Sequence, residues 1–381
     1  MDLKTLQRLF QAHKESKLFG RYINGDNIAP LLKKLNLNFK LEIVGNSVLG
    51  EPIHLITVGS GSKNVFMWSQ MHGNESTTTK AIFDLCNVFA NSAENAVKQI
   101  LRNCTIHIIP ILNPDGAKMY TRLNANYIDL NRDAQDLSQP ESICLRDCFE
   151  KIKPNVCFNL HGQRTIFSAG TTDNPATVSF LAPAQDEARS ITKTRQKAME
   201  VIILMNDNLQ TQIPHQVGIY DDAFNLKCVG DTFQSLEVPT VLFEAGHFPD
   251  DYNREVVREY IFQSMLLALE YISSKELTGY NYKSYFNIPQ NEKLFYDFII
   301  RNAKVGDRNV DLAVQYKELL IGDELKFIPV VEKISDLTDF YGHKEVDANS
   351  SVVLTHDKQV IYEGYENDFV LLNNEVLSFK L

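Results

Sequence analysis

Two residues near position 70 could bind one metal ion together. His72 and Glu75 are three residues apart in the segment Met71-His-Gly-Asn-Glu75. On a tight loop that enters a helix, this spacing lets an imidazole and a carboxylate point at one ion. His161, from a distant strand, could complete a His₂Glu set with an open coordination position, which catalytic zinc requires. Taken alone, the pattern is also typical of a surface loop with a capping glutamate, and His161 of a buried structural histidine.

Four apolar segments with the pattern of buried strands run directly into polar, reactive residues. The segments are residues 64–70, 105–111, 156–160 and 240–243, and the polar residues that follow them are 71–75, 112–116, 161–163 and 244–247. In open α/β sheets, ligands bind in the crevice outside the carboxyl ends of the strands. We therefore expect the polar residues that follow these four strands to converge on one crevice.

The elements that must position these residues alternate between strands and helices. Helical spacing in residues 76–90, 185–210 and 251–275, between the strand-like segments, predicts an α/β domain over about residues 36–278. Residues 1–35 have a helical pattern and are assigned to the same domain, which then covers residues 1–279. Beyond it, short strands are predicted at 312–316, 324–330, 351–354 and 360–362, so residues 280–381 are expected to form a small β-rich appendage.

Composition limits the classes of partner. The chain has 381 residues, 44% of them hydrophobic, and a formal net charge of −10. An acidic chain without a basic face argues against a general affinity for nucleic acid. No apolar run is long enough to span a bilayer, and the first 20 residues lack the pattern of a signal peptide. We therefore expect a cytoplasmic protein with neither a nucleic acid nor a membrane as its partner.

The order of the motifs resembles that of the zinc carboxypeptidase family. The resemblance covers about residues 45–270. In the family's order the chain carries His72-Gly-Asn-Glu75, Asn113-Pro-Asp-Gly116, Arg122, Asp129-Leu-Asn-Arg132, Asn159-Leu-His161 and Phe243-Glu244. The resemblance implies a doubly wound α/β fold, with a mixed, mostly parallel sheet of the carboxypeptidase type, and one zinc ion.

Carried over residue by residue, the resemblance implies a metal set and a general base. His72, Glu75 and His161 match the zinc ligands, and Glu244 matches the general base. Asp129 matches the carboxylate that orients a ligand histidine, which fixes its tautomer and raises its basicity.

The resemblance also implies residues that bind the substrate. Arg122 matches the arginine that polarises the scissile carbonyl. Asn131 and Arg132 match the pair that grips the terminal carboxylate, for which a planar guanidinium is well suited. Tyr220 lies where family members often carry a mobile tyrosine, and Asp231 where the family lines its specificity pocket; a half-buried tyrosine and a turn-capping aspartate are the ordinary alternatives.

These assignments predict a metallocarboxypeptidase that removes a C-terminal residue from short peptides, using zinc-activated water and the Glu244 base. The alternative is an N-acyl amino acid deacylase of the aspartoacylase or succinylglutamate desuccinylase type, which favours the same His-Gly-Asn-Glu motif. Asn113-Pro-Asp-Gly116 favours the peptidase. A non-catalytic binding protein on this fold would need a broken site, yet every ligand and base position is filled. Asp133-Ala134, where many family members have Asn and an aromatic residue, is a departure within the substrate pocket.

Overall fold

The computed structural model describes residues 1–381, which divide into two compact units. Residues 1–163 and 176–291 form one unit, here called the α/β unit, and residues 164–175 and 292–381 form the other, here called the β unit. The sequence pattern predicts a boundary at residue 280. In the structure residues 280–291 belong to the α/β unit, where buried Tyr285 accepts a hydrogen bond from the Ala182 N–H.

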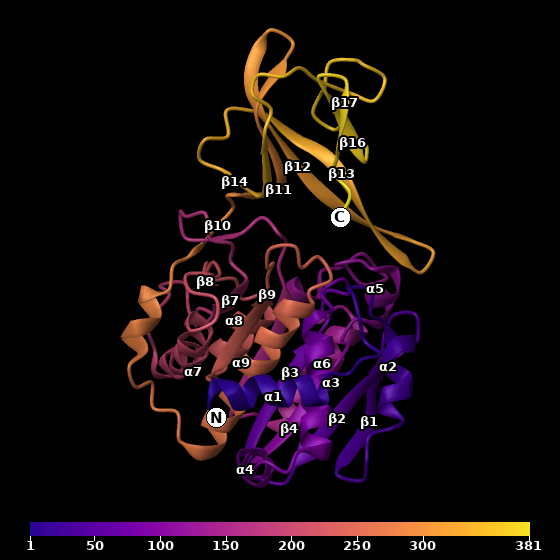
Figure 1. Ribbon diagram of the computed structural model, residues 1–381. Coiled ribbons are helices and arrows are strands. Elements are labelled where there is room, and N and C mark those ends of the chain that lie inside the picture. The colour runs from indigo at the N-terminus through magenta and orange to yellow at the C-terminus, as the bar shows by residue number, and fades with distance from the viewer. The chain divides into compact units, whose positions relative to one another are not determined.

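An eight-stranded sheet forms the centre of the α/β unit (Figure 1). Its strands in spatial order are β1 (Phe39–Asn46), β2 (Pro52–Gly59), β4 (Cys104–Ile109), β3 (Lys63–Ser69), β5 (Val156–Gly162), β9 (Thr240–Ala245), β7 (Val178–Leu181) and β8 (Val217–Ile219). The central strands β4, β3, β5 and β9 pair in parallel, whereas β1, β2 and β7 introduce antiparallel pairs. The sheet is therefore mixed and mostly parallel, as predicted.

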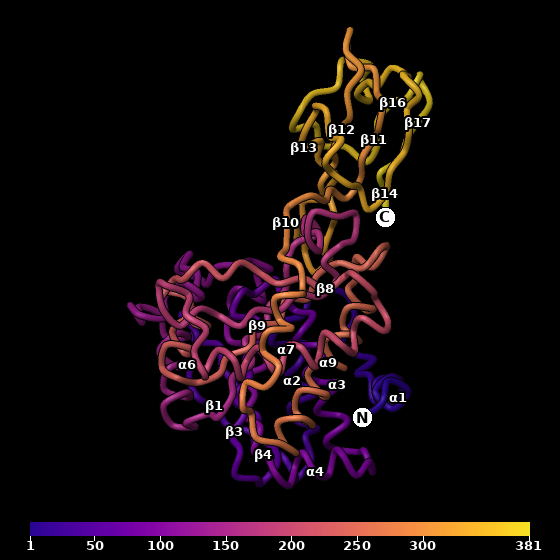
Figure 2. The backbone as a smooth tube through the Cα atoms, turned by 90° about the vertical axis from the view of Figure 1, so that its left-hand side faces the viewer, coloured from indigo at the N-terminus to yellow at the C-terminus, as the bar shows by residue number.

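Helices cover both faces of this sheet. They are α1 (Leu3–His13), α2 (Gly25–Leu32), α3 (Thr77–Asn91), α4 (Asn95–Asn103), α5 (Pro114–Met119), α6 (Pro140–Ile152), α7 (Lys193–Gln210), α8 (Val229–Ser235) and α9 (Glu255–Ser274), with 3₁₀ turns η1 (Leu130–Arg132) and η2 (Tyr282–Asn287). One apolar core joins one face of the sheet to α1, α3, α4, α7 and α9, and a second joins the other face to α6 and α8. Figure 2 shows α6 on one side of the sheet and α1 and α9 on the other. None of the helices combines the length and the apolar character needed to cross a bilayer.

The start of α7 shows how a local cap overrides periodicity. The sequence pattern predicts a helix over 185–210, but α7 begins only at Lys193 because the Thr192 side chain caps it by accepting from the Arg195 N–H. Helix α4 was not predicted separately, nor were the short strands β7 and β8. Such short elements depend on their neighbours in the sheet more than on their own sequence.

The β unit has a core of its own. Its main sheet has the order β13 (Glu324–Ser335), β12 (Arg308–Ile321), β11 (Phe295–Val305) and β14 (Tyr341–Asp347). A smaller sheet contains β15 (Val353–Leu354), β16 (Phe369–Leu372) and β17 (Glu375–Ser378), and β6 (Ser168–Ala169) pairs with β10 (Asn291–Glu292). The strand predicted at 360–362 is wrong, because that segment is a loop with a single bridge from Val360 to Leu354.

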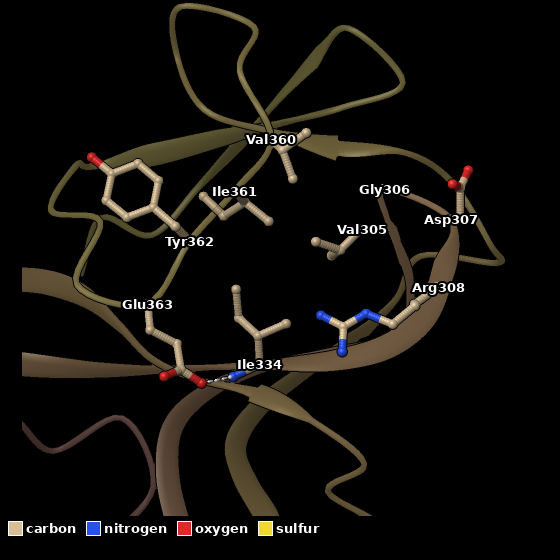
Figure 3. A pocket seen from close by; sticks show the side chains of 9 residues that line it. All are labelled: Val305, Gly306, Asp307, Arg308, Ile334, Val360, Ile361, Tyr362 and Glu363. Carbon is tan, nitrogen blue, oxygen red and sulfur yellow. Dashed lines mark hydrogen bonds between the residues drawn. The ribbon is translucent and has the colours of Figure 1, made fainter.

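An open pocket of about 630 Å³ lies within the β unit (Figure 3). Val305, Ile334 and Ile361 point into it, and the Arg308 guanidinium lies at one side. Its lining is Val305, Gly306, Asp307, Arg308, Ile334, Val360, Ile361, Tyr362 and Glu363. None of the predicted site residues belongs to this lining, so the pocket is separate from the predicted chemistry.

Candidate metal centre and active site

The parallel central strands bring the predicted residues together. The segment with His72 and Glu75 follows β3, and His161 and Glu244 lie near the ends of β5 and β9. His161 pairs directly with Glu244 in the register of β5 and β9. The polar residues that follow these strands therefore converge at one edge of the sheet, as predicted.

The segment from Gln70 to Ser76, here called the metal loop, turns tightly between β3 and α3. The Glu75 N–H donates to the His72 carbonyl at 3.1 Å, and the Asn113 side-chain amide donates to the Met71 carbonyl at 3.2 Å. Gly73 has no room for a side chain, since a Cβ there would lie 2.0 Å from the Gly116 carbonyl carbon. This close approach fixes the turn that lets His72 and Glu75 face the same point.

Three side chains present their donor atoms to one another. His72 Nδ1 lies 2.9 Å from Glu75 Oε1 and 3.2 Å from His161 Nδ1, and His161 Nδ1 lies 3.0 Å from Glu75 Oε2. Around a tetrahedral zinc ion with ligand bonds of about 2.0–2.1 Å, ligand atoms are roughly 3.3 Å apart. The observed separations are close to that value.

The hydrogen-bond partner of His72 supports the same interpretation. His72 Nε2 lies 3.0 Å from Asp129 Oδ1, and because a carboxylate only accepts, Nε2 carries the hydrogen. In the neutral ring Nδ1 then presents a lone pair to the carboxylate of Glu75 and to His161. Lone pairs that converge at this distance repel unless a proton or a metal cation lies among them. The three residues therefore fit a zinc ion.

The charges of the cluster favour a cation. Burial alone would raise the pKa of Glu75. When His72 is protonated on both ring nitrogens, its charge and hydrogen bonds from both histidines hold the pKa of Glu75 far below its usual range. The pKa of Asp129 is likewise lowered, against the effect of burial, by its hydrogen bond to His72 and by the charges of His72 and Arg122. Both carboxylates are thus anionic at neutral pH. Burial lowers the pKa of His161, which favours its neutral, ligating form.

Arg122 lies beside the ligand cluster. Its Nε and Nη2 donate to Asp129 Oδ2 at 3.1 and 3.0 Å, and its Nη1 lies 3.4 Å from Glu75 Oε1. The side chain is 46% exposed, so part of the guanidinium faces outward. Such a fixed, accessible cation can stabilise negative charge that develops on a ligand.

Glu244 is buried beside the same cluster. Its side-chain Oε2 is buried with no hydrogen-bond partner. Burial, together with the negative charge of Glu75, raises the pKa of Glu244 well above its usual range, whereas the charge of Arg122 lowers it. A carboxyl group in this environment accepts a proton more readily than an exposed one.

Asn131 and Arg132 lie in η1, directly after Asp129. The Asn131 side-chain oxygen accepts from the Val229 N–H at 3.0 Å, which ties η1 to the start of α8. Arg132 Nη1 donates to the Asn131 carbonyl at 2.7 Å and lies 3.2 Å from Cys228 Sγ. Asp133, the departure from the family pattern, accepts from the Ser138 and Gln139 N–H groups, so here it shapes the approach to α6.

Tyr220 lies near the carboxylates of Glu244 and Glu75, and Asp231 lies near Arg132. The Tyr220 N–H donates to the Phe180 carbonyl at 2.9 Å, and burial with the charges of Glu244 and Glu75 raises the pKa of its hydroxyl. Asp231 is buried in α8 and accepts from the Asn225 N–H at 3.2 Å. Burial raises the pKa of Asp231 to about 6, against the opposing charge of Arg132.

Two further residues in this region could not be predicted from the sequence. Cys228 contacts Arg132 through its thiol, and Gln70 begins the metal loop with a left-handed backbone, φ +44°. Nothing in the cysteine spacing pointed to the former. Gln70 adjoins His72 in the sequence, but its hydrogen-bond partners could not be read from the motif.

The family model described as zinc carboxypeptidase matches residues 31–228. This range is 198 of the 381 residues, slightly more than half of the chain. The chain belongs to the zinc carboxypeptidase family. Members of this family depend on zinc, in agreement with the donor set described above. The matched range contains His72, Glu75 and His161, whereas Asp231 and Glu244 lie beyond it.

Curated relatives and solved structures agree with this assignment. Carboxypeptidase SOL1 of Arabidopsis thaliana is 24% identical over 201 residues, which are 46% of this chain and 41% of the relative. Carboxypeptidase E of Caenorhabditis elegans is 29% identical over 151 residues, 33% of this chain and 32% of the relative. The chain thus spans well under half the length of either. The carboxypeptidase A of Helicoverpa armigera shares the fold, with a TM-score of 0.54, 15% identity and coverage of 72% of this chain and 81% of that one.

Proposed function

We propose that the protein is a zinc metallocarboxypeptidase that removes the C-terminal residue from short peptides. The observation that carries the proposal is the convergence of His72 Nδ1, His161 Nδ1 and the Glu75 carboxylate within 3.2 Å, beside the buried carboxyl group of Glu244. Membership of the zinc carboxypeptidase family supports it, as do the names of the two relatives.

Substrate binding is assigned to the cations and the amide around the metal ligands. Arg132 would hold the terminal carboxylate of a peptide through its planar guanidinium, and Asn131 would donate from its side-chain amide. Arg122, fixed on Asp129, would donate to the oxygen of the scissile carbonyl as negative charge develops there. Tyr220 would close over the bound peptide.

His72, Glu75 and His161 would hold the zinc ion, with Asp129 fixing the His72 ring. Bound zinc supplies Lewis acidity and lowers the pKa of water from about 15.7 to about 7. Glu244 takes the proton of the attacking water on its carboxylate and passes it to the leaving amine nitrogen, a transfer worth roughly 10²–10⁴-fold in rate. Burial of Glu244 keeps this carboxyl group basic enough for the task.

Asp231 suggests a preference for a positively charged terminal side chain. Asp231 is a buried carboxylate, and the nearby charge of Arg132 lowers its pKa against the effect of burial. A basic residue at the peptide terminus would gain an ion pair there, whereas an acidic residue would be repelled.

The test is zinc-dependent hydrolysis across three matched sets: short peptides with a free C-terminal carboxylate, the same peptides amidated at the C-terminus, and N-acyl amino acids. We expect residues to be released only from the free-carboxylate peptides, with loss of activity on chelation and recovery on addition of zinc. Cleavage of N-acyl amino acids alone would move the protein to the deacylase alternative, which neither of the two carboxypeptidase relatives favours.

A further inference from the structure

The metal loop begins at a buried side chain that no assigned role uses. Gln70 is fully buried, and its Nε2 donates to the Gly73 carbonyl at 2.7 Å and to the Ile23 carbonyl at 2.9 Å. Its backbone has φ +44°, a region that disfavours residues with a Cβ. Such a conformation persists only where the surrounding contacts determine it. The Gln70 amide therefore donates one hydrogen bond to a backbone carbonyl within the metal loop and one to a backbone carbonyl outside it.

The outside partner belongs to residues 14–24, here called the N-terminal brace, which precede residue 31 where the family match begins. The Ser76 hydroxyl, at the other end of the metal loop, donates to the Arg21 carbonyl in the same brace. Thus both ends of the loop, on either side of His72 and Glu75, are tied to one segment.

The N-terminal brace is itself anchored to the α/β unit. Arg258 donates to the Leu18 carbonyl at 2.6 Å and to the Glu15 carbonyl at 2.9 Å. The Tyr22 hydroxyl donates to the Lys118 carbonyl at 2.9 Å, and Asn24 caps α2 through its side chain. The brace is therefore a fixed partner for the metal loop.

On its other side the metal loop rests against α5. Gly73 packs against the Gly116 and Ala117 backbone, so the loop cannot relax in that direction. His72 and Glu75 lie on either side of Gly73 and Asn74. If Gln70 no longer held the Gly73 carbonyl, these two side chains could turn away from the point that they now share. Partners that orient metal ligands typically change metal affinity by roughly 10–100-fold when they are removed.

We infer that Gln70, linked to the N-terminal brace, is a positioning residue that aligns His72 and Glu75 and thereby sets the affinity of the site for zinc. The inference rests on the proposed function for the identity of the metal. It extends the metal site to a segment outside the range that the family model matches.

The substitution Gln70→Gly tests this inference, because glycine adopts a left-handed backbone without strain, so the backbone can keep its conformation while the side chain and its amide are lost. We expect the Kd for zinc, measured by competition with a chromophoric chelator, to rise about 10-fold or more. Lys153→Gly is the matched control, since exposed Lys153 also has a left-handed backbone, φ +50°, at the end of α6. Its zinc Kd should equal that of the wild type.

A purely structural role for Gln70 would lower the unfolding midpoint of the zinc-free protein and leave the zinc Kd unchanged, and that result would overturn the inference. If Gln70→Gly does not fold, Ser76→Ala replaces it: a several-fold rise in Kd supports the tie to the brace, and an unchanged Kd overturns it. A wild type that binds no zinc would refute the proposed function itself, which keeps the two failures distinct.

Discussion

Asp129 connects the proposed metal ligand His72 to Arg122, the proposed substrate-binding arginine, through its two oxygens. Oδ1 faces His72 Nε2 and accepts from the Asn131 N–H, whereas Oδ2 accepts two hydrogen bonds from Arg122. One carboxylate thus fixes the tautomer of a ligand, the start of η1 and the direction of the guanidinium. A substitution of Asp129 should therefore lower both the affinity for zinc and the rate of catalysis.

Asp129→Asn keeps the size of the side chain but removes its charge. An asparagine can still accept from His72 Nε2, yet it raises ligand basicity less and holds Arg122 more weakly. We expect zinc affinity to fall roughly 10–100-fold and kcat to fall even when zinc is saturating. Chelator competition and steady-state kinetics measure the two effects. Asp136→Asn, at an exposed aspartate paired with Lys227, is the control and should change neither.

Asp231 gives a pH-dependent prediction. Because burial raises its pKa to about 6, the carboxyl group is neutral below that pH and anionic above it. The ratio of kcat/KM for a peptide ending in lysine to that for one ending in leucine should therefore increase as pH rises from 5 to 7. In Asp231→Asn the ratio should be low and flat. A wild-type ratio that does not change over this range would show that Asp231 does not contact the terminal side chain.

At the scale of elements, the site depends on parallel strands that end together. The apolar runs of β3, β4, β5 and β9 could be predicted from the sequence because a strand buried on both faces is almost continuously apolar. The four strands pair in parallel, and their polar ends meet as expected. By contrast, β7 and β8 have only four and three residues and carry no pattern long enough to recognise.

Short segments and main-chain contacts also account for the features that were predicted wrongly or not at all. Ile361 is buried while Val360 and Tyr362 are 55% and 56% exposed, so a loop in the β unit imitates the alternation of a strand. His72 and Glu75 could be predicted from the order of the motifs along the chain, although their spacing alone also fits a capped surface loop. The role of Gln70 could not be predicted, because one of its partners is a main-chain carbonyl 47 residues away. Every residue has such a carbonyl, so the sequence does not show which one Gln70 contacts.

The close approach of the metal loop to α5 predicts a strong effect of one methyl group. In Gly73→Ala the new Cβ would lie 2.0 Å from the Gly116 carbonyl carbon, which is backbone and cannot move alone. We expect a loss of about 1–3 kcal/mol in the free energy of unfolding, together with weaker zinc binding. Urea denaturation and chelator competition measure these effects. Gly25→Ala in α2, where a Cβ meets nothing within 4 Å, should leave both nearly unchanged.

At the scale of the whole molecule, the N-terminal segment is part of the α/β unit through buried charges. Arg258 and Asp84 form an ion pair in which both side chains are fully buried, and Arg258 also donates to carbonyls of the N-terminal brace. Lys80, buried as well, pairs with Glu255. These pairs join α3 and α9 to the N-terminal brace, which supports the metal loop.

Loss of one partner should be costly, because it leaves an uncompensated buried charge. Arg258→Ala is expected to destabilise the protein by about 3–5 kcal/mol, measured by urea denaturation. Arg8→Ala is the control: Arg8 pairs with Glu94 on the surface, and exposed pairs contribute about 0–1 kcal/mol. Equal effects of the two substitutions would refute the idea that the buried network anchors the N-terminal segment.

The proposed function depends on Glu244, which we expect to transfer protons at a zinc site formed by His72, Glu75 and His161. The most direct measurement is the rate at which Glu244→Gln releases the C-terminal residue from a short peptide, at a zinc content matched to the wild type. We expect a loss of roughly 10²–10⁴-fold in kcat with zinc bound at wild-type affinity. Wild-type turnover by Glu244→Gln would show that Glu244 does not transfer the proton.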